Sequence, residues 1–283
     1  MPKIAIVTDS STAITPQEAK ALGIFVAPLA VYIDGKDYMD FINVQPTDIV
    51  DALKARKDIK TSQPNVGALD ELFQKLKAEK YDHIIAISIS SVLSGTFQAF
   101  RLAAASNEID NFTLIDTLSA ASPLRHTAKE AKKMADAGKS VDEIVAFIER
   151  VIKDSMTYIL PDSLDQLIHG GRVKGATAVL GQLLKIKLCL KIEYNVPPIE
   201  KFDTARTDVK LFQAIVEDFG KRNITPATHK VYMPQCESMA RVDAFKAYLN
   251  DKLPGFEYEV IALPAGIAAH TGFAFGVQPV LKA

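Results

Sequence analysis

Polar side chains, most of them hydroxyl-bearing, gather in three turns of this chain. They are Asp9, Ser10 and Ser11; Thr61 and Ser62; and Ser94 and Thr96 on either side of Gly95. The first and third turns follow predicted strands, and the second and third precede predicted helices. Ligands of open α/β sheets bind just past the carboxyl ends of strands, and hydroxyls with backbone N–H groups at a helix start form an anion site. The turns therefore predict a site for a carboxylate or a phosphate, although each one alone is more often a helix cap.

Three further side chains could serve the same anion. His270 and Thr271 stand before a glycine in a predicted loop near the C-terminus. There the imidazole could hydrogen-bond an acid head group or carry its proton, although a lone histidine is more often structural. Arg172 follows two glycines. Its guanidinium could clamp a carboxylate or a phosphoryl group, or be a solvated charge.

The motifs of several other chemistries are absent from the sequence. No Gly-Lys pair has a glycine five residues before its own glycine, and no Gly-x-Gly-x-x-Gly occurs. A P-loop kinase and a Rossmann dehydrogenase are therefore disfavoured. The five histidines show no metal-binding spacing, and residues 91–95 lack the first glycine of a hydrolase elbow. We expect no cofactor and no metal.

Composition and charge point to an ordinary globular protein. The chain has 283 residues, of which 48% are hydrophobic and 24% charged, and its formal net charge is −1. The sequence shows no basic stripe, which disfavours nucleic acid as the main partner. Its two cysteines form no cluster, no signal peptide is recognised, and lysines interrupt the most apolar stretch, residues 176–192. We therefore expect a cytoplasmic location.

Short apolar runs alternate with amphipathic stretches along the chain. Expected strands cover residues 4–8, 25–33, 83–89, 112–116, 156–160, 188–192, 230–233 and 257–263. Expected helices cover residues 47–55, 66–79, 95–105, 124–137, 141–152, 209–222 and 239–253. Thr15 with Glu18 and Ser140 with Glu143 are typical of capping boxes. This alternation predicts an α/β fold with a parallel-sheet α/β/α domain at residues 1–154 and a second α/β domain at residues 155–283.

Five motifs in this order resemble the DegV family over nearly the whole chain. They are residues 3–11, the tetrapeptide 61–64, residues 90–98, residues 161–164 with 170–172, and residues 269–272. The resemblance implies two α/β domains with a palmitate- or oleate-like fatty acid in an apolar tunnel between them. It places the carboxylate near Thr61, Ser62, Ser94, Gly95, Thr96, His270 and Thr271, with Arg172 at the same mouth.

The resemblance also implies a role. Members present their lipid to a separate ATP-dependent kinase that makes an acyl phosphate, which agrees with the missing nucleotide motif. We therefore expect a carrier subunit rather than an enzyme, a kinase partner and transient lipid exchange at a membrane surface. Two alternatives remain open. One is an acyl hydrolase or phosphotransferase that uses Ser94 and His270, and the other is a regulator that binds a different anion.

The sequence departs from the family pattern in three places. Residues 117–125 lack the usual glycines, residues 184–189 lack an expected proline, and residues 194–198 replace an Asp-Gly turn. The first departure bears on acyl-chain preference. The other two bear on the surface that faces the kinase.

Overall fold

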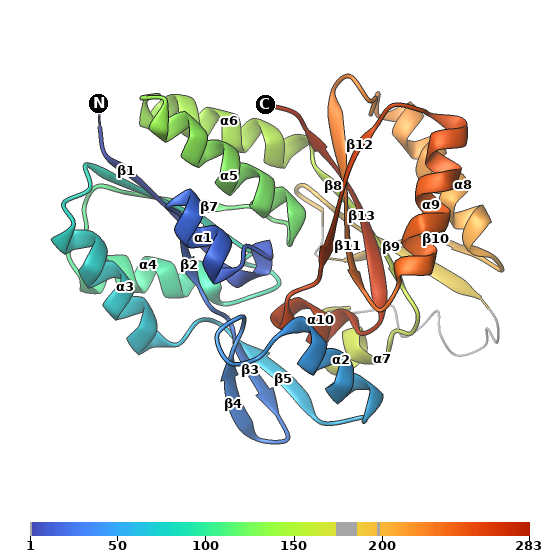
Figure 1. Ribbon diagram of the computed structural model, residues 1–283, viewed down its shortest axis with the longest axis horizontal. Helices are drawn as coiled ribbons and strands as arrows, with labels where there is room; N and C mark the ends of the chain where they lie inside the picture. Colours follow the sequence, from blue (N-terminus) through green and yellow to red (C-terminus); the bar gives the residue numbers. More distant parts are fainter. Residues whose placement is uncertain (1, 174–185, 197–198) are drawn as a thin grey trace.

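Three β-sheets organise the computed structural model, which describes residues 2–173, 186–196 and 199–283 (Figure 1). The first sheet is parallel, in the order β2 (Phe25–Ala27), β1 (Ile4–Asp9), β6 (His83–Ser88) and β7 (Phe112–Asp116). All six residues of β1 are buried, as expected of a strand covered on both faces.

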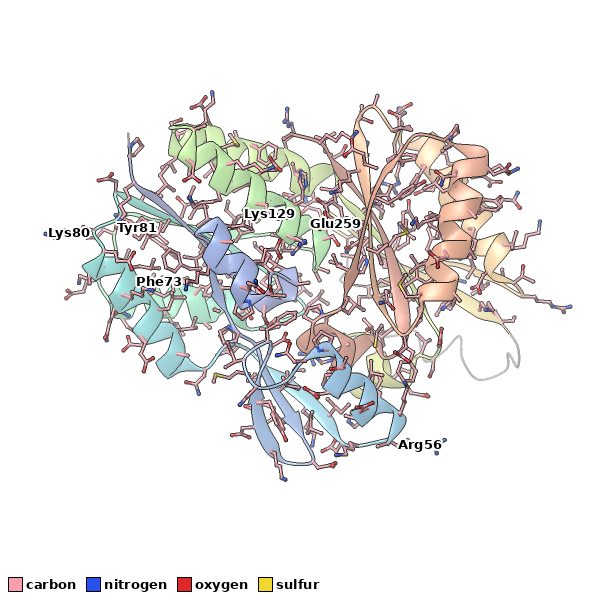
Figure 2. All side chains as sticks on the ribbon, viewed as in Figure 1. Arg56, Phe73, Lys80, Tyr81, Lys129 and Glu259 are labelled. Carbon is pink, nitrogen blue, oxygen red and sulfur yellow. The ribbon has the colours of Figure 1, made fainter. Side chains whose placement is uncertain are left out.

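Helices cover both faces of this first sheet. On one face lie α3 (Val66–Ala78) and α4 (Thr96–Ser106), which bury residues such as Phe73 (Figure 2). On the other lie α1 (Pro16–Leu22), α5 (Ser122–Asp136) and α6 (Val141–Asp154). The predicted parallel α/β/α arrangement of the first half is confirmed.

The second sheet is mixed. Its order is β10 (Glu200–Ala205), β9 (Lys187–Glu193), β8 (Met156–Pro161), β13 (Ala274–Leu281), β11 (His229–Cys236) and β12 (Glu257–Ala262). Among these described strands the β11–β12 pair is parallel and the other four pairs are antiparallel. One face packs on α8 (Asp208–Lys221) and α9 (Met239–Lys252), whose phenylalanines join an aromatic core. On the other face, Tyr232 and Val280 join the core formed by α5 and α6.

The third sheet was not predicted. It is antiparallel, in the order β4 (Lys36–Met39), β3 (Ala30–Ile33) and β5 (Ile59–Ser62), and α2 (Pro46–Lys54) lies beside it. The strand region expected at residues 25–33 forms two strands, β2 and β3, rather than one. Pro28, which has no N–H for a ladder, lies between β2 and β3, and the two strands belong to different sheets.

Short helices complete the chain: η1 (Ser10–Thr12), α7 (Asp165–His169) and α10 (Ala265–Thr271). The loop expected at His270 and Thr271 is therefore wrong, because both are the last residues of α10. The buried carboxylate of Asp40 explains this helix: it accepts hydrogen bonds from the first N–H groups of α10, those of Ala265 and Gly266.

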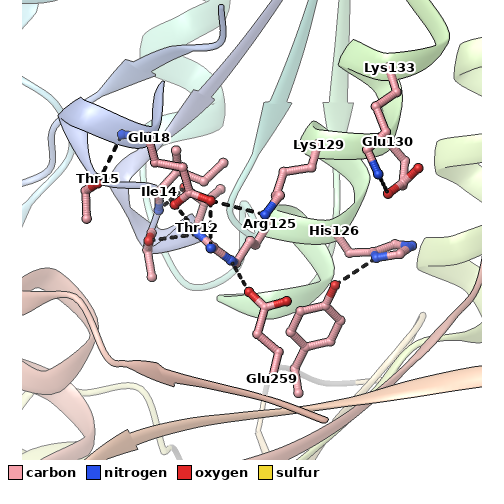
Figure 3. Close-up of polar contacts among 12 residues, drawn as sticks. Thr12, Ile14, Thr15, Glu18, Arg125, His126, Lys129, Glu130, Lys133 and Glu259 are labelled. Atoms are coloured by element: carbon pink, nitrogen blue, oxygen red, sulfur yellow. Dashed lines mark hydrogen bonds and ion pairs between the residues drawn. The ribbon is translucent and has the colours of Figure 1, made fainter. Parts of the chain in front are cut away.

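Both predicted caps form, but only one is a reciprocal box. Ser140 and Glu143 bond each other's backbone, whereas Thr15 caps α1 without a return bond. The carboxylate of Glu18 instead binds the buried guanidinium of Arg125, which also binds Glu259 of β12 (Figure 3). Arg125 thereby ties the first half of the chain to the second.

No helix among the described residues is long and apolar enough to span a bilayer. The apolar stretch 176–192 and the departures at 184–189 and 194–198 fall partly outside the described residues, at 174–185 and 197–198.

Candidate functional site

A cavity of about 240 Å³ lies where the three sheets and α10 meet. Its walls include residues just past the carboxyl ends of β6 and β7, the location that the sequence predicted for a ligand. A single water needs only about 10–15 Å³ of such space, so the cavity can hold a chain of many atoms. Most of the wall is apolar, including Leu29, Ile89, Ile159, Leu167, Ile192 and Ile267.

The structure brings most of the predicted polar residues to this cavity. Lining it are Thr61, Ser62, Ser94, Gly95, Arg172, His270 and Thr271. Thr96 is not among the lining residues. Its side chain is buried, and its hydroxyl lies 2.8 Å from that of Ser94. The assignment of these residues to a bound anion stays a prediction.

Thr61 and His270 form the central polar contact. Thr61 lies on β5 beside β3, and its hydroxyl oxygen is 2.6 Å from Nε2 of His270 at the end of α10. Burial, with the nearby charges of Arg172 and His169, lowers the pKa of His270 to about 4. The imidazole is therefore neutral at pH 7 and carries one N–H.

The surroundings of His270 decide which nitrogen carries that proton. Nδ1 is buried and finds no hydrogen-bond partner among the described residues, and it packs so closely on Gly170 that an added Cβ would lie 2.3 Å away. We assign the proton to Nε2, where it bonds Thr61. The hydroxyl of Thr61 then accepts from His270, and its own proton is free to donate into the cavity.

The turn before α4 forms the opposite side of this polar end. The N–H of Thr96 donates to the hydroxyl of Ser94 at 3.3 Å. A side chain on Gly95 would lie 2.2 Å from Oε1 of Gln63, so glycine permits this close approach of the two turns. Both Ser62 and Gly95 are exposed, which opens this end of the cavity to solvent.

Arg172 brings a positive charge to the same place. Its guanidinium donates to the carbonyl oxygens of Leu93 and Gly170. Within the described part of the chain it forms no ion pair with a carboxylate. An unpaired guanidinium here favours an anionic ligand and disfavours a protonated His270.

The contacts do not assemble a nucleophile with its base. His270 bonds Thr61, and the hydroxyl of Ser94 bonds Thr96. No hydrogen bond joins Ser94 to His270 in the described residues, although a Ser94 nucleophile would need one. The described residues also contain no group of three or more potential metal ligands.

The first hydroxyl turn has a structural role rather than a place on the cavity wall. Asp9 accepts from the N–H groups of Ser11 and Ile89, and Ser10 donates to Asp40. Burial raises the pKa of Asp40 to about 6. Asp40 was missed in the sequence because its partners on α10 lie more than 220 residues away.

The departure at residues 117–125 also reaches the cavity. Ala120 and Ala121 line it, and Ala121 has a φ of 64°. Only glycine adopts this conformation readily, so the alanine costs on the order of 1–3 kcal/mol. Gln278 and Thr157 line the cavity as well. They were missed because a single polar residue in a strand has no local signature.

Comparisons with known proteins agree with this picture. A family model described as "Uncharacterised protein, DegV family" matches residues 3–281. A DegV domain-containing protein of Listeria monocytogenes is 32% identical over 271 residues, which cover 95% of each chain.

Solved structures resemble the chain over its full length. A DegV family protein from Thermus thermophilus, whose structure is described for its fatty acid binding, superposes with a TM-score of 0.88 at 30% identity and full coverage of both chains. DegV of Bacillus subtilis, described as a fatty acid binding protein, superposes with a TM-score of 0.82 at 28% identity, again with full coverage.

Proposed function

Since this chain belongs to the DegV family, we propose that it binds one long-chain fatty acid in the cavity between its sheets. The carboxylate lies against Thr61, Ser94 and His270, and the acyl chain follows the apolar wall. The observation that carries the proposal is one cavity with a mostly apolar wall and with hydroxyls, an imidazole and a guanidinium at one end. Two solved relatives that are described as binding fatty acids share the whole fold.

The apolar wall supplies most of the affinity. About 15 buried CH₂ groups contribute roughly 12 kcal/mol at about 0.8 kcal/mol each. Association costs at least about 4 kcal/mol, which leaves about 8 kcal/mol, a Kd on the order of 1 µM before any head-group bond. The polar end therefore sets the direction of the fatty acid more than it sets the total affinity.

The polar end also suits presentation of the carboxylate to a partner. It opens beside the exposed residues Ser62 and Gly95, and Arg172 lies at the same mouth. We propose that a separate ATP-dependent kinase phosphorylates the carboxylate there, and that the chain is a cytoplasmic carrier without catalysis of its own. Lipid then enters and leaves by transient exchange at a membrane surface. The missing nucleotide motifs in the sequence support this division of labour.

Calorimetric titration of the delipidated full chain tests the binding proposal. Palmitate is expected to bind at about one per chain, and hexadecanol serves as the ligand without a carboxylate. Thr61→Val removes one charge-assisted hydrogen bond of about 1.5–3 kcal/mol and should weaken palmitate binding by at least about tenfold while sparing hexadecanol. The matched control is Thr47→Val, at an exposed position on α2.

Two results would count against the proposal. Failure of palmitate to bind the wild-type chain would remove the ligand class. Equal weakening of palmitate and hexadecanol by Thr61→Val would show that Thr61 does not meet the carboxylate.

A further inference from the structure

A second polar pair lines the cavity besides the residues assigned to the carboxylate: Thr157 of β8 and Gln278 of β13. The cavity follows β8 and β13, which pair so that Ala274 faces Pro161 and Gly276 faces Ile159. Ala274 also lines the cavity, three residues after Thr271, which belongs to the residues assigned to the carboxylate. Gln278 is four residues further along β13, about 14 Å away at about 3.4 Å per residue. Gln278 and Thr157 both line the cavity.

Backbone partners fix the orientation of the Gln278 amide. Its Oε1 accepts from the N–H of Ser122 at 3.0 Å, and its Nε2 donates to the carbonyl of Ala120 at 2.9 Å. In a flipped amide, Nε2 would face the N–H of Ser122 and Oε1 would face the carbonyl of Ala120, so donor would meet donor and acceptor would meet acceptor. The observed orientation is therefore the correct one. The second Nε2 proton goes to the hydroxyl oxygen of Thr157 at 2.8 Å.

This bond leaves one donor without an acceptor. Because Thr157 accepts from Gln278, its own hydroxyl proton is available, and the described residues offer it no hydrogen-bond acceptor. Thr157 is 4% exposed and Gln278 is 2% exposed, so solvent does not reach the pair from outside. A buried donor that meets only methylene groups is unfavourable, whereas a ligand oxygen at this point would satisfy it.

We propose that the pair Thr157–Gln278 recognises an oxygen atom on the acyl chain, so that the ligand class is an oxygenated long-chain fatty acid. The inference rests on the proposed function, because it places the carboxylate near Thr61 and His270. An extended chain with C–C bonds of about 1.5 Å advances about 1.25 Å per carbon, and about 14 Å then corresponds to roughly eleven carbons. A hydroxyl or keto group near the twelfth carbon meets Thr157.

The test compares 12-hydroxyoctadecanoic acid with octadecanoic acid on the delipidated full chain, by calorimetry. The wild-type chain should bind the hydroxy acid about tenfold more tightly, as one net hydrogen bond predicts. Thr157→Val keeps the shape and removes the donor, so it should abolish the preference, while Thr157→Ser should retain it. Thr204→Val, on the edge strand β10, is the matched control and should leave the preference unchanged.

The outcomes separate this inference from the proposed function. Equal binding of the two acids by the wild-type chain, or an unchanged preference in a folded Thr157→Val variant, would overturn the inference alone. Failure of both acids to bind would overturn the proposed function and the inference together. The wild-type comparison needs no variant and therefore stands even if a substitution impairs folding.

Discussion

Gly170 holds His270 in place, and a single methyl group there should disturb the carboxylate site. A Cβ at position 170 would lie 2.3 Å from Nδ1 of His270 and 3.1 Å from the carbonyl oxygen of Gln166. Gly170 itself has φ −71° and ψ −11°, which alanine adopts without strain. Gly170→Ala therefore acts through the clash and not through the backbone.

The imidazole cannot shift away from the added methyl group without disturbing its bond to Thr61. An ordinary contact is 3.4 Å or longer, so the ring would have to move by about 1.1 Å, the difference between 3.4 and 2.3 Å. On its other side, Nε2 is already 2.6 Å from the hydroxyl of Thr61. The ring must swing out of its rotamer and break that bond. We expect a loss of about 1.5 kcal/mol in fatty-acid binding, roughly tenfold in Kd.

Calorimetric titration with palmitate measures this loss. Gly220→Ala is the matched control, because nothing lies within 4 Å of its added methyl group and alanine favours the helix α8. The double variant Gly170→Ala with His270→Ala should bind no more weakly than His270→Ala alone, since both act on one side chain. Additive losses in the double variant, or wild-type affinity in Gly170→Ala, would refute the reasoning.

Three further predictions concern the ion pairs of Arg125, the titration of His270 and the role of Arg172. Arg125→Ala leaves Glu18 and Glu259 without their buried partner and should lower the free energy of unfolding in urea by about 3–5 kcal/mol. The control Arg101→Ala, at an exposed position, should lower it by no more than about 0.5 kcal/mol. Equal losses would contradict this prediction. The folded state lowers the pKa of His270 to about 4, so only the unfolded chain binds that proton as the pH falls from about 6.5. Between about pH 6.5 and pH 4 the free energy of unfolding of the wild-type chain should therefore fall by on the order of 3 kcal/mol relative to that of His270→Gln. Parallel pH profiles of the two proteins would contradict this. Arg172→Ala should slow phosphoryl transfer by the partner kinase more than it weakens palmitate binding, and equal loss of both would argue against a partner-facing role.

The parts of the fold that the sequence predicted carry strong local patterns. The strand β1 and the helix α3 have continuous or periodic apolar residues that end up buried. The strand β4 of the third sheet lacks such a pattern, because it has four residues and none of them is buried. The mixed order of the second sheet depends on long-range pairing, such as β8 with β13, which no local signal reports.

The candidate site likewise has residues that the sequence predicted and residues that it did not. Hydroxyl turns at strand ends and helix starts pointed to Thr61 and Ser94, and both line the cavity. The side chains that position the site were not predictable. Asp40 acts on a helix more than 220 residues away, and Gln278 bonds residues more than 120 positions away. Each depends on tertiary packing that only the folded chain supplies.

The mass of the ligand that stays bound through purification tests the central claim most directly. Native mass spectrometry of the full chain, followed by denaturing extraction, measures both the stoichiometry and the identity of that ligand. The account predicts a long-chain fatty acid at about one per chain. A chain that is empty after purification and that also refuses added fatty acids would contradict it.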